Sequence, residues 1–504
     1  MSMPAERLST TSNLQELLRD FADAPALDIT GISSDSRALQ PGDLFLACGG
    51  ERSHGVDYIA AAVTAGVAAI AWDSATTEAP HCEVGIPMIA APGLAQHLGE
   101  IANRFYGRPS ADMRVVGVTG TNGKTTVAWL IAQCFQSLNQ TCAYVGTLGS
   151  GIGEIAGAVG MTTPGAIELH GRLARFRDAG ATCAAVEVSS HALAQNRVDG
   201  VAFDTVLFTN LSRDHLDYHG DMQSYAQTKA RLFLECGAKH RIVNLDSEFG
   251  TQLAAQCGQD VIAVSTTSDR VADGRPYVFA RSTVAKDAGS QVSVSSSWGD
   301  GEFTLPLPGD FNIANAVIVL ALLLQHGIPM DKACAVLATV SAPPGRMQRV
   351  AAEGDSPSVY VDYAHSPAAI EVALRALKAH CKGKLWCVFG CGGERDQGKR
   401  PQMARMAELS ADRLIVTSDN PRSEDPSAII ADIVSGLAKP ESATVIEDRA
   451  AAIAWAVREA AADDVVLIAG KGHENYQLLG DKRIDFSDYG AASANLAARS
   501  EADE

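Results

Sequence analysis

Short apolar runs separated by helical patterns occupy most of the chain from residue 113 onward. VVGV, CAYVG, AAVEVSS, TVLFTN and RIVNLD each have the length of a buried strand, and VAWLIAQCFQSL, which follows the first of them, has the spacing of a helix. Apolar strands that are continuous rather than alternating, with helices between them, are typical of a parallel sheet covered on both faces. The pattern therefore predicts an α/β fold.

Two changes in this pattern predict three domains. Residues 1–91 hold short strands with Gly and Pro turns, and a helix over 94–106 leads into the strand-and-helix rhythm. SAPPGR, at 341–346, interrupts that rhythm, and VYVDY, KLWCVFG, DRLIVTSDN, ATVIED and DVVLIAG restart it. A chain of 504 residues has the length of about three domains. We expect a small N-terminal α/β domain at 1–91, a central parallel-sheet domain at 92–342 and a C-terminal Rossmann-like domain at 343–504.

Composition narrows the class of partner. Hydrophobic residues make up 46% of the chain and charged residues 20%, as in ordinary globular proteins. The net charge is −18, and such a surface repels nucleic acid and anionic lipid, so we expect neither as a partner. A phosphate-bearing substrate must then be held by local basic side chains and backbone N–H groups.

The cysteines and the N-terminus favour a cytoplasmic protein. The 11 cysteines show no C-x-x-C pair and no metal-finger spacing. An odd number of cysteines without a disulfide framework indicates a reducing compartment. Residues 1–20 lack the apolar stretch of a signal peptide, and no run of about 18 apolar residues predicts a membrane span. We expect a cytoplasmic protein with no membrane partner.

The strongest chemical signal is the segment from Gly120 to Thr126, which reads GTNGKTT. It follows a strand and opens a helix, where glycines let backbone N–H groups approach a phosphate and the helix dipole attracts negative charge. Lys124 would neutralise the β- and γ-phosphates of ATP and Thr125 would hold Mg²⁺, although the usual first glycine of such a loop falls on Val118. The sequence predicts ATP binding by Gly120, Thr121, Asn122, Gly123, Lys124, Thr125 and Thr126.

Two polar clusters follow other strands of the central domain. Glu187 ends an apolar strand in EVSSH, and NLSRDHLDYH at 210–219 supplies further carboxylates and imidazoles. Mg²⁺ prefers oxygen ligands, which makes Glu187 a natural ligand. Each cluster alone also fits a capped strand end. Because the carboxyl ends of parallel strands meet at one edge of a sheet, we expect both clusters to converge with the phosphate loop on one site.

These motifs resemble the Mur ligase family. TGTNGKTT, EVSSH and DHLDYHG followed by Y-x-x-x-K occur in the family's order, and matching motifs cover essentially the whole chain. The resemblance implies an ATP-dependent ligase of peptidoglycan precursor synthesis, which joins an amino acid to a UDP-linked muramyl peptide through an acyl phosphate. It also implies two Mg²⁺ sites and a carbamylated lysine. The implied catalytic residues are Lys124, Glu187, His215 and Lys229, and the implied metal ligands are Thr125, Glu187, His215 and Lys229 as N6-carboxylysine.

The resemblance extends the ATP site beyond the loop. Asn312 and Asn315 in LPGDFNIANA match the family's adenine-proximal segment. Arg346 in PPGRMQ, with Asp362 and His365 in DYAH, matches its nucleotide-closing elements on the C-terminal domain. These five side chains are the further ATP contacts that the resemblance implies.

A D-N-P-R segment follows a strand of the C-terminal domain. Asp-Asn-Pro by itself is a turn former, but a guanidinium at a strand end is also a candidate reader of a carboxylate. In the resembling family this motif marks the members that add meso-2,6-diaminopimelate to UDP-N-acetylmuramoyl-L-alanyl-D-glutamate, and the lysine-adding members lack the arginine. The implied diaminopimelate contacts are Arg395, Asp419, Asn420, Pro421, Arg422, Gly470 and Glu474.

The N-terminal domain carries SDSR and PGDLF, which match the family's UDP-binding domain. The resemblance implies that the uracil and diphosphate are held by Ser34, Ser36, Glu51, Arg52 and Ser53. It implies contacts to the muramyl-dipeptide by Thr162, Thr163, Ser189, Gln195 and Arg197.

Three other functions share part of this pattern. Folylpolyglutamate synthesis uses a similar loop and lysine, but the UDP-type first domain and D-N-P-R argue against it. A nucleotide-switched GTPase would need an N-K-x-D motif, which the sequence lacks. A non-catalytic ATP-binding module would not need Lys124, Thr125, Glu187, His215 and Lys229 together. We expect a monomeric enzyme.

Overall fold

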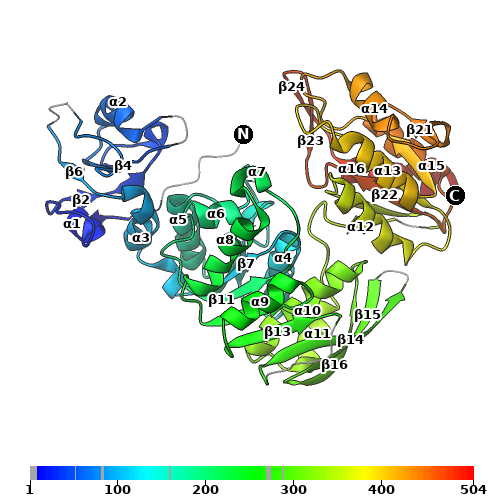
Figure 1. Ribbon diagram of the computed structural model, residues 1–504, viewed down its shortest axis with the longest axis horizontal. Coiled ribbons are helices and arrows are strands. Elements are labelled where there is room, and N and C mark those ends of the chain that lie inside the picture. Colours follow the sequence, from blue (N-terminus) through cyan, green and yellow to red (C-terminus); the bar gives the residue numbers. More distant parts are fainter. Residues whose placement is uncertain are drawn as a thin grey trace. The chain divides into compact units, whose positions relative to one another are not determined.

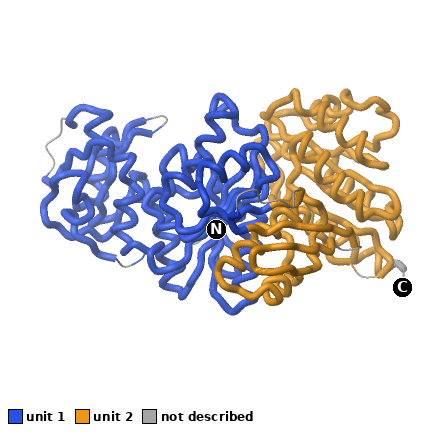
Figure 2. Tube along the Cα trace, turned by 60° about the horizontal axis from the view of Figure 1, so that its bottom comes forward, with its two compact units in different colours: residues 1–264, 271–276 blue, residues 265–270, 277–504 orange. Residues whose placement is uncertain are grey.

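The computed structural model describes residues 8, 10–50, 53–80, 85–157, 160–267, 274–286, 289–352 and 354–503. They form two compact units, which Figure 2 draws in different colours. Unit 1 holds residues 1–264 and 271–276, and unit 2 holds residues 265–270 and 277–504. Both units combine sheets with covering helices, which confirms the α/β class (Figure 1). The three domain ranges expected from the sequence stay predictions.

The N-terminal part of unit 1 is a small parallel sheet buried on both faces. Leu44 and Leu46 of β4 join one apolar cluster with helix α3, and Phe45 and Ala47 join another with α2, because side chains alternate along a strand. Helix α3 confirms the helix predicted at 94–106. The strands pair in the order β3-β4-β5-β6, at Gly31–Ser33, Asp43–Ala47, Ala69–Trp72 and Met88–Ala90. The other elements are β1 (Ser12–Asn13), β2 (Asp28–Ile29), α1 (Leu14–Leu18), α2 (Ile59–Thr64) and α3 (Leu94–Phe105).

The rest of unit 1 is a larger sheet with the strand order β13-β12-β11-β7-β10-β8-β9. These strands are parallel except β9, which pairs antiparallel with β8. The strands are β7 (Arg114–Thr119), β8 (Cys142–Gly146), β9 (Gly149–Ile152), β10 (Cys183–Glu187), β11 (Phe203–Phe208), β12 (His240–Asn244) and β13 (Val261–Ser265). The helices are α4 (Lys124–Ser137), α5 (Ala166–Asp178), α6 (Ser190–Ala194), α7 (Leu216–His219), α8 (Met222–Leu234) and α9 (Glu248–Gln256). All five apolar runs predicted as strands are therefore confirmed.

The register of this sheet brings three loops to one edge. β7 lies between β10 and β11, with Glu187 beside Val118 and Phe208 beside Thr119. The loops that follow β7, β10 and β11 therefore leave the sheet at the same height. This confirms that the strand-end motifs meet at one edge.

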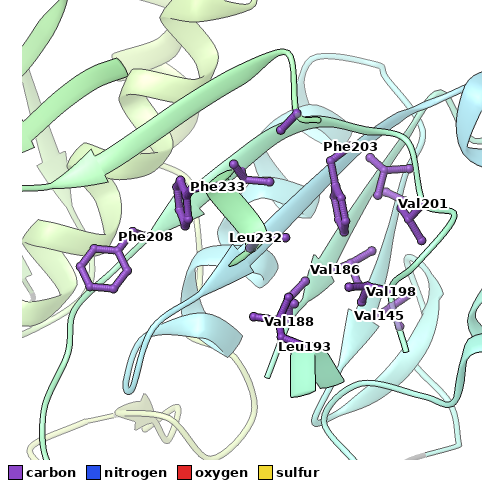
Figure 3. Close-up of a cluster of buried hydrophobic side chains, with 14 of the residues drawn as sticks. Val145, Val186, Val188, Leu193, Val198, Val201, Phe203, Phe208, Leu232 and Phe233 are labelled. Atoms are coloured by element: carbon purple, nitrogen blue, oxygen red, sulfur yellow. The ribbon is translucent and has the colours of Figure 1, made fainter. Parts of the chain in front are cut away.

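One face of the sheet is covered by an apolar cluster to which α6 and α8 contribute. Val145, Val186 and Phe203 point into it from the strands, beside Leu193 and Phe233 from the helices (Figure 3). Because successive side chains of a strand face opposite ways, the residues on either side of Val145 in β8 and of Val186 in β10 lie on the other face. Helix α4 packs against β8 and β10, and both faces of the sheet are buried.

Unit 2 opens with antiparallel strands that the apolar runs did not predict. Val292 and Val294 of β15 are buried while Ser293 between them is partly exposed, so the strand alternates instead of forming a continuous apolar run. Such a segment, rich in Ser, resembles a polar loop in composition. The elements are β14 (Tyr277–Lys286), β15 (Gly289–Ser296), β16 (Gly299–Leu305), α10 (Asp310–Gln325) and α11 (Met330–Leu337).

The C-terminal part of unit 2 is a second parallel sheet, in the order β17-β18-β22-β19-β20-β21 with only β17 antiparallel among the described strands. The strands are β17 (Gln348–Arg349), β18 (Ser358–Asp362), β19 (Leu385–Phe389), β20 (Arg413–Val416), β21 (Ala443–Val445) and β22 (Val465–Ala469), with a hairpin of β23 (Tyr476–Leu479) and β24 (Lys482–Asp485). The helices are α12 (Pro367–Lys378), α13 (Lys399–Ser410), α14 (Pro426–Val434), α15 (Arg449–Glu459) and α16 (Asp488–Asp503). The five predicted strands are confirmed. No helix among the described residues is long and apolar enough to cross a membrane.

A buried ion pair ties the strand ends of this second sheet together. Arg449 donates to both carboxylate oxygens of Asp488, at 2.7 and 2.8 Å, and both side chains are fully buried. The same guanidinium donates to the carbonyls of Ser418 at 3.2 Å and Ala469 at 2.9 Å. Ser418 follows β20 and Ala469 ends β22. Arg449 therefore fixes the edge from which the D-N-P-R segment (419–422) and the GKGHE segment (470–474) start.

Breaking this pair should destabilise the protein strongly. Arg449→Met leaves the Asp488 carboxylate buried without its partner, and we expect a loss of about 3–5 kcal/mol in the free energy of urea unfolding. Arg458→Met is the matched control in the same helix, because the Arg458–Glu459 pair is 69% and 45% exposed. Its effect should stay within about 0.5 kcal/mol. Similar small losses in both variants would contradict the role given to Arg449.

Candidate active site

The phosphate loop of unit 1 joins the end of β7 to the start of α4. Gly120 has a φ of +149° and Gly123 a φ of +87°, which residues with side chains rarely adopt. A Cβ at Gly120 would also lie 1.9 Å from the Oγ1 atom of Thr209. The loop therefore requires glycine here. It opens the 14-residue helix α4, whose first N–H groups have no partner within the helix and can bind an anion.

The segment after β11 holds this loop in place. The Asn122 N–H donates to the side-chain oxygen of Asn210 at 3.0 Å, and the Thr121 N–H donates to the Asn210 carbonyl at 2.8 Å. The Thr209 hydroxyl donates to the Asn122 carbonyl at 2.6 Å. Asn210 opens the polar segment 210–219 that the sequence predicted to converge with this loop, whereas Thr209 was not predicted as a site residue. The only signal of Thr209 was its position at the end of an apolar run.

Two lysines converge on one carbonyl of the loop. Lys124 donates to the carbonyls of Gly120 and Thr121, both at 2.9 Å. Lys229, on α8, is 1% exposed and donates to the same Gly120 carbonyl at 2.8 Å. Burial, and after it repulsion by Lys124, lowers the pKa of Lys229 well below its ordinary value. Its amine is therefore held toward the neutral form, which is the form that reacts with electrophiles.

Tyr225 connects Lys229 with His215. The Lys229 amino group lies 4.6 Å from the centre of the Tyr225 ring, and the His215 ring lies 6.2 Å from it. The Tyr225 hydroxyl contacts the Thr121 hydroxyl at 3.2 Å. The structure thus brings both residues of the implied second metal site to one aromatic side chain beside the phosphate loop.

Glu187 ends β10 and is fully buried beside the start of α4. The Thr125 hydroxyl donates to its Oε2 atom at 3.0 Å. No group of three or more His, Cys, Asp or Glu side chains with metal-site geometry occurs in the part of the chain that the structure describes. A Mg²⁺ ion, which takes few protein ligands and completes its shell with phosphates and water, fits a threonine and glutamate pair of this kind.

The residues implied to contact the muramyl-dipeptide form one connected group around the end of β10. The Thr163 hydroxyl donates to the Glu187 carbonyl at 2.7 Å and lies 3.3 Å from the Ser189 hydroxyl. Arg197 donates to the Thr163 carbonyl at 3.1 Å and to the side chain of Gln195. Thr162 joins the group through the Thr147 hydroxyl at 3.2 Å. The structure brings all five predicted residues together.

The described N-terminal residues implied to hold UDP lie in the loops that follow β3 and β4, which are adjacent parallel strands. Ser34 is exposed and Ser36 starts a 3₁₀ helix at Ser36–Ala38, while Ser53 accepts a hydrogen bond from Tyr58 at 3.1 Å. Glu51 and Arg52 lie outside the described residues. Their implied role stays a prediction.

In unit 2, the implied nucleotide-closing residues surround Tyr363. The Arg346 guanidinium lies 4.3 Å from the Tyr363 ring centre, and the His365 ring lies 4.7 Å from it. The Asp362 carboxylate accepts the backbone N–H groups of Met347 at 2.7 Å and Ala364 at 2.8 Å. Asp362 thereby fixes the turn that carries Arg346.

The two asparagines implied to lie near adenine sit in the first turns of α10. Asn312 is 2% exposed and donates to the Pro308 carbonyl at 2.8 Å, and Asn315 is 4% exposed. Asn312 thereby secures the loop that precedes the helix.

The implied amino-acid residues of unit 2 gather around a lysine that sequence reasoning missed. Lys471 is fully buried, and its amino group donates to Asn420 Oδ1 at 3.0 Å and to Glu474 Oε2 at 3.2 Å. It lies 3.6 Å from the carboxylate of Asp419. The Leu478 N–H also donates to Asn420 Oδ1, so the amide can only turn its nitrogen to Glu474 Oε2, at 2.8 Å. Two carboxylates and one ammonium leave this cluster with one negative charge.

Arg422 lies beside that cluster with one edge of its guanidinium anchored. Its Nη1 atom donates to the Gly393 carbonyl at 2.7 Å, and Nε and Nη2 have no hydrogen-bond partner among the described residues. A Cβ at Gly392 would lie 3.0 Å from Arg422 Nη1 and 3.8 Å from Arg395 Cγ, so both arginines reach the same glycine turn. The free edge of Arg422 can bind a carboxylate through two parallel hydrogen bonds.

Two further predicted residues shape the backbone around this cluster. Gly470 has a φ of +118°, and a Cβ there would lie 2.7 Å from Asp419 Oδ2. Pro421 is buried, and its carbonyl lies 1.9 Å from where a Cβ at Gly393 would be. The structure therefore brings together all seven residues implied to contact the amino acid.

Comparison with known proteins gives three family models along the chain. They are described as "Mur ligase family, catalytic domain", "Mur ligase middle domain" and "Mur ligase, glutamate ligase domain", over residues 28–106, 118–323 and 345–472. Together they match well over half of the sequence.

Individual relatives match over almost their whole length. The UDP-N-acetylmuramoyl-L-alanyl-D-glutamate–2,6-diaminopimelate ligase of Coxiella burnetii is 46% identical over 469 residues, which is 93% of this chain and 96% of that protein. A solved structure of a ligase with the same name has a TM-score of 0.73 at 34% identity and covers 97% of this chain and 99% of its own. Folylpolyglutamate synthase from Mycobacterium tuberculosis, solved with ADP and AMPPCP, shares the fold at a TM-score of 0.60 and 20% identity, over 80% of this chain and 95% of its own.

His473, next to Glu474, should make stability depend on pH. Burial, and after it repulsion from Arg346, lowers the pKa of His473 to about 4, whereas an unfolded histidine has a pKa of about 6.5. Between these values the unfolded state binds more protons, so stability is lost as the pH falls through this window. We expect wild type to lose roughly 1–2 kcal/mol more than His473→Gln in urea unfolding between about pH 7 and pH 5. Equal losses would show that His473 titrates normally.

Proposed function

This chain belongs to the Mur ligase family, and from that premise we propose that it uses ATP to join meso-2,6-diaminopimelate to UDP-N-acetylmuramoyl-L-alanyl-D-glutamate. The name shared by the Coxiella burnetii relative and the similar solved structure supports this reaction. The chain acts as an amide-forming ligase in peptidoglycan synthesis. Its dependence on ATP and on a nucleotide-linked precursor fits a cytoplasmic enzyme, and we propose that it acts as a monomer.

The proposed choice of amino acid rests on two charged features of unit 2, a cluster with one net negative charge and the free edge of a guanidinium. Asp419, Glu474 and Lys471 together hold one negative charge, which complements one ammonium group. Arg422 offers the free edge of a guanidinium, which complements one carboxylate. An amino-acid end carries one ammonium and one carboxylate. Diaminopimelate has such an end beyond the reacting amine, whereas lysine has only the ammonium.

The reaction proceeds in two displacements. The γ-carboxylate of the D-glutamyl residue attacks the γ-phosphate of ATP, which releases ADP and leaves an acyl phosphate. The amine of diaminopimelate then attacks the acyl carbon, a proton is lost from the nitrogen, and phosphate leaves. The first step brings two anions together, and Lys124 with the N–H groups of the phosphate loop offsets their repulsion.

Thr125 and Glu187 are the residues that would hold Mg²⁺ beside the β- and γ-phosphates. Their oxygens are hard donors already directed at each other, which fits this ion. A bound Mg²⁺ supplies charge that stabilises the transferring phosphoryl group. His215 and a carbamylated Lys229 would hold the second ion.

The surroundings of Lys229 support its carbamylation. A neutral amine attacks CO₂, and burial next to Lys124 favours the neutral form of Lys229. Attack of the neutral amine on CO₂, with loss of one proton, gives an anionic carbamate. The anion then faces the Lys124 ammonium, which attracts it.

Folylpolyglutamate synthase shares the fold, but fold alone does not assign its substrate to this chain. The family model over residues 28–106 and the Arg422 arrangement favour the UDP-linked substrate.

Amino-acid specificity tests the proposal directly. With UDP-N-acetylmuramoyl-L-alanyl-D-glutamate and ATP, phosphate release should be fast with meso-diaminopimelate and slow with L-lysine. With lysine bound, the free edge of Arg422 has no carboxylate partner, which costs roughly 2–3 kcal/mol. This value is the lower part of the range for truncated charge pairs, because the side chain is only half-buried. It corresponds to a preference of about 30- to 150-fold in kcat/KM. In Arg422→Ala the KM for diaminopimelate should rise by this factor, with the KM for ATP little changed.

The control is Arg413→Ala, which removes an exposed arginine of the same sheet and should leave both constants unchanged. Equal use of lysine and diaminopimelate by the wild type would contradict the proposed substrate. An unchanged preference in Arg422→Ala would return the D-N-P-R segment to a purely structural turn.

The modified lysine has its own signature. Lys229→Ala should lose most ligase activity, and formate or acetate should restore part of it by supplying the missing oxygens. Lys239→Ala, which removes a 74% exposed lysine, is the matched control and should stay active. Full activity of Lys229→Ala without added acid would show that no carbamate is needed.

A further inference from the structure

Tyr144 lies on the same face of the sheet as Glu187. In β8 it is paired with Ala185 of β10, and Glu187 comes two residues later, so the two side chains point to the same side. Helix α4, which starts with the phosphate-loop lysine, packs over this face. The Trp129 ring of α4 meets the Tyr144 ring edge to face, with centres 5.9 Å apart. Tyr144 is fully buried between the helix and the carboxylate.

The hydrogen-bond direction of the Tyr144 hydroxyl is fixed. The backbone N–H of Leu148 donates to this oxygen at 3.4 Å, so the hydroxyl proton is available for another acceptor. That acceptor is the Oε1 atom of Glu187, and an ionised carboxylate can only accept. Gly146 leaves the room for this contact, because a Cβ there would lie 2.1 Å from Glu187 Oε1 and 2.5 Å from the Tyr144 hydroxyl.

The two oxygens of Glu187 consequently differ. Oε1 accepts from the Tyr144 hydroxyl and from the backbone N–H of Thr147 at 3.0 Å, donors that are held by packing and by the backbone. Oε2 accepts from the hydroxyls of Thr125 at 3.0 Å and Thr147 at 3.1 Å. A threonine hydroxyl can rotate and offer a lone pair instead of its proton, whereas a backbone N–H cannot.

We propose that Tyr144 is a positioning residue that makes Glu187 a one-oxygen metal ligand. It holds Oε1, together with the Thr147 N–H, and leaves Oε2 to face the cation beside the Thr125 hydroxyl. The inference rests on the proposed function, because the cation is the Mg²⁺ that accompanies ATP there. Metal ligands whose second atom is hydrogen-bonded bind more tightly, and loss of such a partner costs about 10–100-fold in metal affinity or activity.

Tyr144→Phe tests the inference, since it removes the hydroxyl and keeps the ring against Trp129. We expect the Mg²⁺ concentration for half-maximal activity to rise at least about tenfold, with the KM for the amino acid unchanged. Mn²⁺ binding in the presence of a non-hydrolysable ATP analogue, followed by the EPR signal of free Mn²⁺, should weaken by a similar factor. Tyr360→Phe, a buried tyrosine of β18 in the other sheet, is the matched control and should change neither value.

The outcomes separate this inference from the proposed function. Unchanged Mn²⁺ affinity in Tyr144→Phe overturns the positioning role, even where the wild type ligates diaminopimelate. A selective tenfold loss of Mn²⁺ affinity supports the positioning role, even where the wild type proves to use a different amino acid. A loss of activity in Tyr144→Phe that saturating Mg²⁺ does not reverse also counts against the inference.

Discussion

The carbonyl oxygen of Gly120 accepts hydrogen bonds from Lys124 and Lys229, and the geometry of the candidate phosphate site depends on this convergence. The two lysines come from different helices, so one backbone oxygen joins α4 and α8 to the loop. Burial, and after it repulsion by the Lys124 ammonium, lowers the pKa of Lys229 well below its ordinary value. Only glycine fits at 120, because the hydroxyl of Thr209 occupies the space of a Cβ. The reactivity proposed for Lys229 is therefore a consequence of the loop's own packing.

A buried lysine plays a comparable part in unit 2. Lys471 neutralises one of the two carboxylates of Asp419 and Glu474, and it fixes which way the Asn420 amide points. Beneath them, Arg449 and Asp488 hold the strand ends from which these residues start. The net charge that Lys471 leaves on Asp419 and Glu474 thus determines which charge a bound ligand group must carry.

Sequence reasoning identified the strands and motifs better than it identified the supporting side chains. Continuous apolar runs gave every predicted strand of the two parallel sheets, but β14 to β16 were missed because their many polar and exposed residues resemble a loop. Lys471 was missed because a lysine in a glycine-rich segment normally lies at the surface, and Tyr144 because an aromatic residue in an apolar strand normally belongs to the core. The role of each depends on a partner that is distant in sequence, Asn420 for Lys471 and Glu187 for Tyr144.

The sequence by itself determined the fold class, the phosphate loop and the family, since these depend on local signals: apolar period, glycines at fixed spacing and motifs in order. Only the tertiary structure decided which residues share a face or an oxygen atom. Strand register sets Tyr144 beside Ala185 and so opposite the same helix as Glu187. The fold brings Lys229 to Gly120, 109 positions away in the chain. Burial and the charges of such neighbours set protonation and orientation, and neither is encoded in any single stretch of sequence.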